Sequence, residues 1–466
     1  MSDIKFGTDG WRAIIADDYT VKNVIRVAEA TAIFMKERAM QKVVIGYDCR
    51  FGGKMFAETA ARVMGTHQIE VVMGDHVAST PMVSLGVRKL GADLGIVITA
   101  SHNPPSYNGF KLKSSYGGPS VPDDVTAVEN HIPEKPMTDL ISLEDMKAKG
   151  HLSYLNLEDM YYDHVMASFD IPAIRQSDFT IGYDAMYGAG YLIFPRILPQ
   201  AKCLHCDYNP SFYGQAPEPI ERNLQPFRDM IKSDPRMQIG IANDGDADRI
   251  GMFDGDGNFV DSHHILLLLL LYLHKYKNMT GKVVVTFSVT DKMVQLAQKF
   301  GLPYEVTKIG FKYIAEIMTR EDVLVGGEES GGLAVKGHIP ERDGVWIGLM
   351  ILEFMAKTGK SLKELVQLVY DEIGTFAFDR DDLHITQTQK EDVLDKCHGD
   401  KYSTFGTYTI TRTEKLDGFK YYLSNGTWVM IRPSGTEPVL RVYCEAPDRA
   451  IARTTLDAVR KELLGA

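Results

Sequence analysis

The sequence predicts an α/β protein with three consecutive α/β domains, built on mixed sheets, and a smaller C-terminal α+β domain. Three observations predict this class. Strand-like and helix-like segments alternate through most of the 466 residues, polar stretches separate units of similar length, and the final unit carries closely spaced strands. Domain sizes of this order are usual. We place the boundaries so that the domains are 1–150, 151–256, 257–370 and 371–466.

In the first three units, short apolar runs rich in β-branched residues alternate with segments that have helical periodicity. We expect helices at residues 21–40 and 54–65. The apolar run 265–273 is about half as long as a membrane span needs, so we expect a buried helix there. The expected strands are 42–47, 69–73, 95–99, 180–183, 238–242 and 282–286.

The last unit has a different pattern, because short turns join its apolar runs. This spacing indicates an antiparallel sheet. A helix is expected after the sheet, at residues 448–464. The expected strands are 407–412, 420–423, 427–432 and 439–443.

Composition and charge exclude several classes of protein. The 51 basic residues are outnumbered by 62 acidic ones, and no basic patch is evident, so we expect no nucleic-acid partner. The first residues lack the apolar core of a signal peptide, and we expect no membrane association. Five scattered cysteines fit a reducing, cytoplasmic setting, with Cys203 and Cys206 as free thiols rather than half of a zinc site. The sequence carries no signal for an oligomeric state.

Ser101 is the first candidate for chemistry. It follows the expected strand 95–99, in a turn that Pro104 and Pro105 keep from becoming helical. Open α/β sheets place reactive groups at the carboxyl ends of such strands. A serine in this position is either a nucleophile or an ordinary turn residue.

Three carboxylates follow another expected strand, at Asp244, Asp246 and Asp248. Helix geometry would separate them, and so would a flat strand, whereas a tight loop through small residues brings them together. Three clustered carboxylates call for a hard cation such as Mg²⁺. The positions of glycine and glutamate do not fit an EF-hand, and the alternative is a solvated acidic turn.

Two further loops carry groups suited to a phosphorylated, hydroxyl-rich ligand. The loop that begins at Arg432 offers a guanidinium, hydroxyls and backbone amides for a phosphate, or is a plain hairpin loop. Glu328 and Ser330 lie between glycine pairs, in a loop that we expect to close on sugar hydroxyls. A second metal site or an exposed loop without function are the alternatives there. Arg12 and Lys111 are candidate anion ligands, and we expect no strand at residues 6–12.

Taken in order, the four loops resemble those of the α-D-phosphohexomutase family, of the phosphoglucomutase/phosphomannomutase type. The resemblance covers essentially the whole chain and implies four domains around a central cleft. It implies a phosphoserine at Ser101, and Mg²⁺ held by Asp244, Asp246, Asp248 and an oxygen on Ser101. The other implied residues are Arg12, His102, Lys111 and Arg249 around the transferred phosphoryl group, Lys308, Glu328 and Ser330 for the ligand, and Arg432, Ser434, Gly435 and Thr436 for the second phosphate.

The resemblance also implies an activity. A hexose 1-phosphate and its 6-phosphate would interconvert through a hexose 1,6-bisphosphate, which would also reload the dephosphorylated enzyme as its activator. His102 and Lys111 are both candidates for the general base. We expect glucose phosphate as the substrate, and glucose 1,6-bisphosphate as the activator, with mannose or glucosamine phosphate as alternatives. Two other classes compete with this reading: a metal-dependent phosphomonoesterase and a non-catalytic sugar-phosphate sensor.

Overall fold

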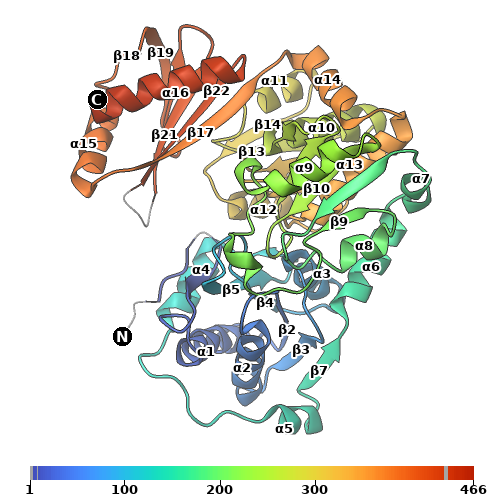
Figure 1. Cartoon of the computed structure of the whole chain (residues 1–466). Coiled ribbons are helices and arrows are strands. Elements are labelled where there is room, and N and C mark those ends of the chain that lie inside the picture. The colour runs from blue at the N-terminus through green and yellow to red at the C-terminus, as the bar shows by residue number, and fades with distance from the viewer. Residues whose placement is uncertain (1–3, 8, 435–438, 466) are drawn as a thin grey trace.

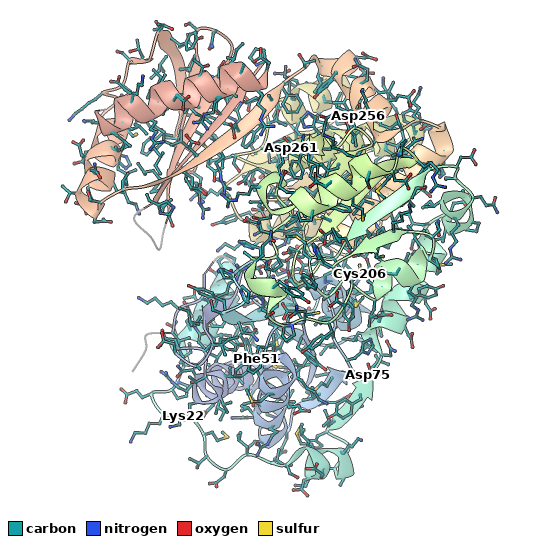
Figure 2. The ribbon with its side chains drawn as sticks, viewed as in Figure 1. Lys22, Phe51, Asp75, Cys206, Asp256 and Asp261 are labelled. Atoms are coloured by element: carbon teal, nitrogen blue, oxygen red, sulfur yellow. The ribbon has the colours of Figure 1, made fainter. Side chains whose placement is uncertain are left out.

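The computed structural model describes residues 4–7, 9–434 and 439–465. It contains four sheets in chain order, and Figure 1 shows the first domain below the second and third, with the fourth domain to one side. Among the described residues, no helix is both long and apolar enough to cross a membrane. Side chains fill the layers between these ribbons (Figure 2).

The first sheet has seven strands, in the order β1-β5-β4-β2-β3-β7, with β6 paired to β5. The pairs β4–β2, β2–β3 and β3–β7 are parallel, and those of β5 are antiparallel. Its elements are β1 (Trp11–Ile14), α1 (Val21–Glu37), β2 (Lys42–Tyr47), α2 (Gly53–Thr66), β3 (Glu70–Gly74), α3 (Thr80–Leu90), β4 (Leu94–Ile98), β5 (Tyr107–Ser114), β6 (Gly118–Pro119), α4 (Pro122–Asn130), α5 (Leu143–Ala148) and β7 (Leu152–Leu155).

Two features of this sheet differ from the sequence expectations. Strand β1 includes Arg12, because Trp11 is buried and pairs with Phe110 on β5. The segment 6–12 therefore ends in a strand rather than in a loop. Strand β7 pairs with β3, so the first sheet continues past residue 150, where we drew the first domain boundary.

The second sheet has the order β12-β11-β10-β8-β9 and the third the order β14-β13-β15-β16. The second unit contains α6 (Leu157–Ser168), α7 (Ile171–Arg175), β8 (Thr180–Asp184), α8 (Ile193–Ile197), β9 (Lys202–Leu204), η1 (Phe212–Gly214), η2 (Glu221–Asn223), α9 (Gln225–Ser233), β10 (Met237–Asn243), β11 (Ile250–Asp254) and β12 (Phe259–Val260). The third contains α10 (Ser262–Leu271), η3 (Tyr272–Tyr276), β13 (Lys282–Thr286), α11 (Lys292–Lys299), β14 (Tyr304–Thr307), α12 (Phe311–Arg320), β15 (Val323–Gly327), β16 (Leu333–Val335), α13 (Gly344–Thr358) and α14 (Leu362–Ile373).

The fourth sheet is antiparallel throughout, in the order β17-β22-β21-β20-β19-β18. Strand β17 leads into it from the third domain (Figure 1). The elements are β17 (Ala377–His384), α15 (Gln387–His398), β18 (Thr404–Phe405), β19 (Tyr408–Glu414), β20 (Phe419–Leu423), β21 (Trp428–Pro433), β22 (Val439–Ala446) and α16 (Arg449–Leu464). This arrangement matches the predicted α+β unit.

The apolar core explains how the domains are joined. One continuous cluster runs from Val44 in the first sheet through the buried helix α10 to Phe376. The fourth domain has a separate core, and a small cluster of Phe287, Trp428, Met430 and Tyr443 links it to the third domain. The first three domains are therefore fastened to one another more extensively than the fourth is fastened to the third.

Candidate active site

Ser101 lies in the loop between β4 and β5, and its side chain is almost fully buried. Its backbone has a φ of 52°, in the left-handed region that residues other than glycine rarely occupy. Its hydroxyl donates to Asp244 Oδ2 at 2.7 Å, across 143 sequence positions. The structure thus brings the predicted serine and the first predicted carboxylate into direct contact.

Arg50 and Asp48 hold this loop in its strained conformation. The Arg50 guanidinium donates to the carbonyl oxygens of Ser101 and Asn103, both at 2.6 Å, and also to that of Pro104 in the same loop and that of Tyr107 at the start of β5. Asp48 accepts from Thr99 at 2.5 Å, and the Thr99 hydroxyl in turn accepts from the Ser101 N–H at 2.8 Å. Neither Asp48 nor Arg50 was among the residues predicted from the sequence, although both directly follow the expected strand 42–47.

The three predicted carboxylates form one cluster in the loop between β10 and β11. Asp244, Asp246 and Asp248 are fully buried, and one oxygen from each lies within 4.8 Å of the others. Gly245 faces the Ser101 loop so closely that a Cβ there would collide with the Ser101 carbonyl oxygen. The tight loop expected from the sequence is present.

The donor chemistry of this cluster fits a divalent cation. Asp246 Oδ1 and Asp248 Oδ1 are buried and have no hydrogen-bond partner among the described residues. Burial and the charges of its two neighbours raise the pKa of Asp244 well above its ordinary value. A hard cation would coordinate the carboxylate oxygens that have no hydrogen-bond partner and would offset the repulsion between the three carboxylates. These residues therefore fit Mg²⁺.

Buried cations face the carboxylates from two other domains. Lys111 Nζ lies 2.8 Å from Asp246 and 3.1 Å from Asp248, and Arg342 Nη2 lies 2.7 Å from Asp248. Asp9 pairs with both cations. Burial opposes the charge of Lys111, but the three carboxylates outweigh it and raise its pKa, so the amine keeps its proton. Arg342 and Asp9 were missed by the sequence analysis.

The other residues expected around the phosphoryl group also lie here. His102 Nδ1 is 3.3 Å from the Ser101 hydroxyl, and burial, together with nearby cations, lowers its pKa well below the ordinary value. Arg12 donates to Asn103 at 2.7 Å. Arg249 donates its backbone N–H to Asp244 at 3.0 Å, and its buried Nε has no partner in the part of the chain that the structure describes.

The predicted sugar loop adjoins the carboxylate loop. Gly332 forms a β-bridge with Arg249, and Gly331 accepts from the Ile250 N–H at 3.1 Å. Glu328 is buried, and this burial raises its pKa to about 7, against the opposing charge of Arg342. Ser330 is half-buried in the same loop. The loop is therefore packed against the carboxylates rather than exposed.

The predicted phosphate loop lies on the fourth domain. Arg432 is at the end of β21, opposite Arg441 on β22, and Ser434 accepts from Lys390 Nζ through its carbonyl at 2.6 Å. Gly435 and Thr436 lie outside the described residues. Lys308 is exposed in the turn between β14 and α12.

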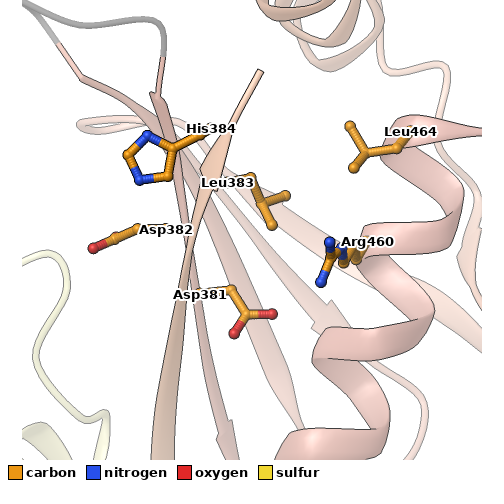
Figure 3. Close-up of a pocket in the computed structure, with 6 residues that line it drawn as sticks. All are labelled: Asp381, Asp382, Leu383, His384, Arg460 and Leu464. Carbon is orange, nitrogen blue, oxygen red and sulfur yellow. The ribbon is translucent and has the colours of Figure 1, made fainter. Parts of the chain in front are cut away.

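Cavities elsewhere do not include these residues. One of about 280 Å³ lies between β17 and α16 and is lined by Asp381, Asp382, Leu383, His384, Arg460 and Leu464 (Figure 3). Another, of about 530 Å³, lies between the third and fourth domains. The candidate chemistry therefore rests on the buried cluster and not on either cavity.

Comparison with known proteins matches the chain to four family models along its length. They are described as phosphoglucomutase/phosphomannomutase alpha/beta/alpha domain I at residues 3–138, domain II at 159–257, domain III at 261–373 and the C-terminal domain at 387–462. The fold and these matches define a mutase, an isomerase-class phosphotransferase.

Individual relatives span nearly the whole chain. A phosphoglucosamine mutase of Methanococcus maripaludis is 30% identical, over 96% of this chain and 95% of its own. A phosphoglucomutase/phosphomannomutase of Thermococcus kodakarensis is 29% identical, over 97% and 96%. A solved structure from Thermus thermophilus, assigned as a phosphomannomutase, is 32% identical, with a TM-score of 0.88 and 99% of both chains covered. The chain belongs to the α-D-phosphohexomutase family.

Proposed function

We propose that this mutase interconverts hexose 1-phosphate and hexose 6-phosphate through a phosphoserine at Ser101. The observation that carries the proposal is the 2.7 Å hydrogen bond from the Ser101 hydroxyl to Asp244, inside a buried cluster of three carboxylates. A hydroxyl held beside acids of this kind, and ringed by cations, suits transfer of a dianionic group, since such transfer depends on positioning and charge neutralisation.

Asp244, Asp246 and Asp248 would hold Mg²⁺, together with an oxygen of the phosphorylated Ser101. The ion would supply positive charge against the phosphoserine, which carries about −2 at neutral pH. Arg12, Lys111 and Arg249 supply fixed cationic donors on the protein side. His102 is kept neutral next to the hydroxyl, so it can accept a proton, whereas Lys111 holds its own proton in this structure.

The proposed cycle conserves the phosphoryl group. Phosphoserine passes it to the free hydroxyl of a hexose monophosphate, whose proton leaves to a base. The resulting bisphosphate turns in the site and returns its other phosphoryl group to the Ser101 oxygen. A hexose 1,6-bisphosphate would reload enzyme that has lost its phosphate.

The substrate's other groups would lie on the third and fourth domains. We assign the sugar hydroxyls to Glu328 and Ser330, with Lys308 nearby. Arg432 and Ser434 would bind the phosphate that is not transferred, and the same role is proposed for Gly435 and Thr436.

The sugar expected from the sequence, glucose, is not confirmed by the relatives. Their names favour the alternatives, mannose phosphate and glucosamine phosphate. We therefore propose these two as better substrates than glucose phosphate.

The test compares the 1-phosphates of mannose, glucosamine and glucose, with Mg²⁺ and a trace of the matching 1,6-bisphosphate. We expect the 6-phosphate to form, with a higher kcat/KM for mannose or glucosamine than for glucose. Mass spectrometry of the intact protein should show one added phosphoryl group at Ser101. Steady release of inorganic phosphate would instead indicate a phosphomonoesterase. Binding without turnover would indicate a sensor, and a preference for glucose would reverse the substrate order.

A further inference from the structure

Asp417 connects the predicted phosphate loop to the third domain. It lies in the turn between β19 and β20, and its carboxylate accepts from Arg432 Nε at 3.2 Å and from Arg432 Nη2 at 3.4 Å. The same carboxylate accepts the backbone N–H of Ile309, in the third domain, at 2.8 Å. One side chain therefore holds both the guanidinium and the turn that carries Lys308.

The geometry of the guanidinium leaves room for a second anion. Arginine has five N–H groups in a planar fork, and Asp417 uses the side formed by Nε and Nη2. The end formed by Nη1 and Nη2 is a second edge at which a guanidinium can bind phosphate in a bidentate manner. Asp417 and a phosphate can therefore bind the same arginine at once.

We propose that Asp417 is a positioning residue for the substrate phosphate that is not transferred. It holds the Arg432 guanidinium so that the Nη1/Nη2 edge is left for the phosphate. Through its hydrogen bond with Ile309, it also fixes the fourth domain to the turn that carries Lys308. This inference rests on the proposed function, because it assumes that Arg432 binds a phosphate of the substrate. Arg432 and Asp417 are each about 23% exposed, so without this contact the arginine side chain would sample other rotamers.

An ion pair between the third and fourth domains provides a matched control. Lys420, on β20, lies 2.6 Å from Asp291 of the third domain and packs 3.9 Å from the Trp428 ring centroid. Neither Lys420 nor Asp291 contacts Arg432 in the interactions described. Removing the Asp291 carboxylate weakens domain attachment without releasing the arginine.

The experiment compares Asp417→Asn, Asp417→Glu and Asp291→Asn with the full-length wild type. Calorimetry measures the Kd of mannose 6-phosphate and of inorganic phosphate, and steady-state kinetics give KM and kcat. We expect Asp417→Asn to raise both Kd values and KM about tenfold, with kcat changed less than about twofold, and Asp417→Glu to recover part of the loss. Asp291→Asn should alter Kd by less than about twofold.

Two outcomes overturn the inference: Asp417→Asn binding both probes like the wild type, or Asp291→Asn weakening them equally. The Kd values are measured without turnover. A failure of the Asp417 inference can therefore be distinguished from a failure of the proposed mutase activity. A wild type that binds mannose 6-phosphate but interconverts nothing would contradict the mutase activity and leave the Asp417 comparison decisive.

Discussion

The two places where this chain would hold phosphate are built in different ways. Around Ser101, side chains from three domains meet in a buried network: Ser101 is 1% exposed, and its carboxylate neighbours are 0% exposed. Around Arg432, the guanidinium is about 23% exposed and is held by a single carboxylate. The side chains of the first site are held by contacts with one another, whereas the second site lies on a domain with its own core.

This difference matches two chemical tasks. Phosphoryl transfer benefits from fixed charges in a site that excludes water, because reorganising them during the reaction would raise the barrier. In the proposed cycle, a site that binds only the remote phosphate must release it each time the intermediate turns.

The largest expected effect concerns the buried site. Ser101→Ala removes the proposed phosphoryl acceptor, and we expect kcat/KM to fall at least ~10²-fold, about 3 kcal/mol or more of transition-state stabilisation. The matched control is Ser106→Ala, an exposed serine of the same loop, which should retain activity. Comparable rates for wild type and Ser101→Ala would remove the covalent mechanism.

Glu328 should make the stability of the buried region depend on pH. Burial raises its pKa to about 7, so the unfolded chain loses this proton first, and stability falls as pH rises from about 4.5 to 7. Glu328→Gln should remove that slope and stabilise the protein above pH 7 by about 3 kcal/mol. Urea unfolding at pH 5 and 8 measures this. The same variant should weaken hexose-phosphate binding while Mg²⁺ affinity stays unchanged, and a loss of Mg²⁺ affinity would show that the loop has been misassigned.

Replacement of Asp248 and of Asp244 by asparagine should change the stability of the metal-free protein by different amounts. Asp248→Asn leaves Lys111 and Arg342 with less countercharge, and we expect a loss of about 2 kcal/mol in EDTA, less than for an isolated buried pair because Asp246 remains. Asp244→Asn relieves repulsion, so its stability in EDTA should equal or exceed that of the wild type. Both variants should bind Mg²⁺ more weakly in a calorimetric titration. Equal stability losses would contradict this account of the charge balance.

The smallest effect is expected for a substitution in the fourth domain, at Arg432, and it should fall mainly on KM. Arg432→Ala removes the charged donor proposed for the remote phosphate, so KM should rise roughly tenfold while kcat changes less. Steady-state kinetics measure both constants. Arg412→Ala, on strand β19 of the same sheet, is the control and should leave KM unchanged. A fall in kcat as deep as that of Ser101→Ala would erase the distinction between the two regions.

Local sequence patterns predicted much of this fold. The strands at 42–47 and 282–286 match β2 and β13 residue for residue, because β-branched runs bounded by polar residues are typical of buried parallel strands. Ser101 and the three aspartates were found because each follows such a strand. Arg12 was expected in a loop, since no pattern in so short a segment reveals that Trp11 pairs with β5.

The supporting residues were missed for a physical reason. Asp9 and Arg342 meet across 333 positions; Asp9 lies in the segment 6–12, where only Arg12 was singled out, and Arg342 lies in no motif that the sequence analysis named. Their roles arise only when three domains are packed together. Asp48 and Arg50 are a different case, because they follow a predicted strand and the rule that found Ser101 applies to them as well.

The hydrogen bonds from Arg50 to three carbonyl oxygens of the Ser101 loop and to one at the start of β5 bear on protein engineering. A transplant of this loop into another scaffold would carry Ser101 but lose the Arg50 hydrogen bonds that hold its backbone. The grafted serine would relax to an ordinary turn and aim its oxygen elsewhere. A graft would therefore need the Ser101 loop together with the segment after β2 that carries Asp48 and Arg50.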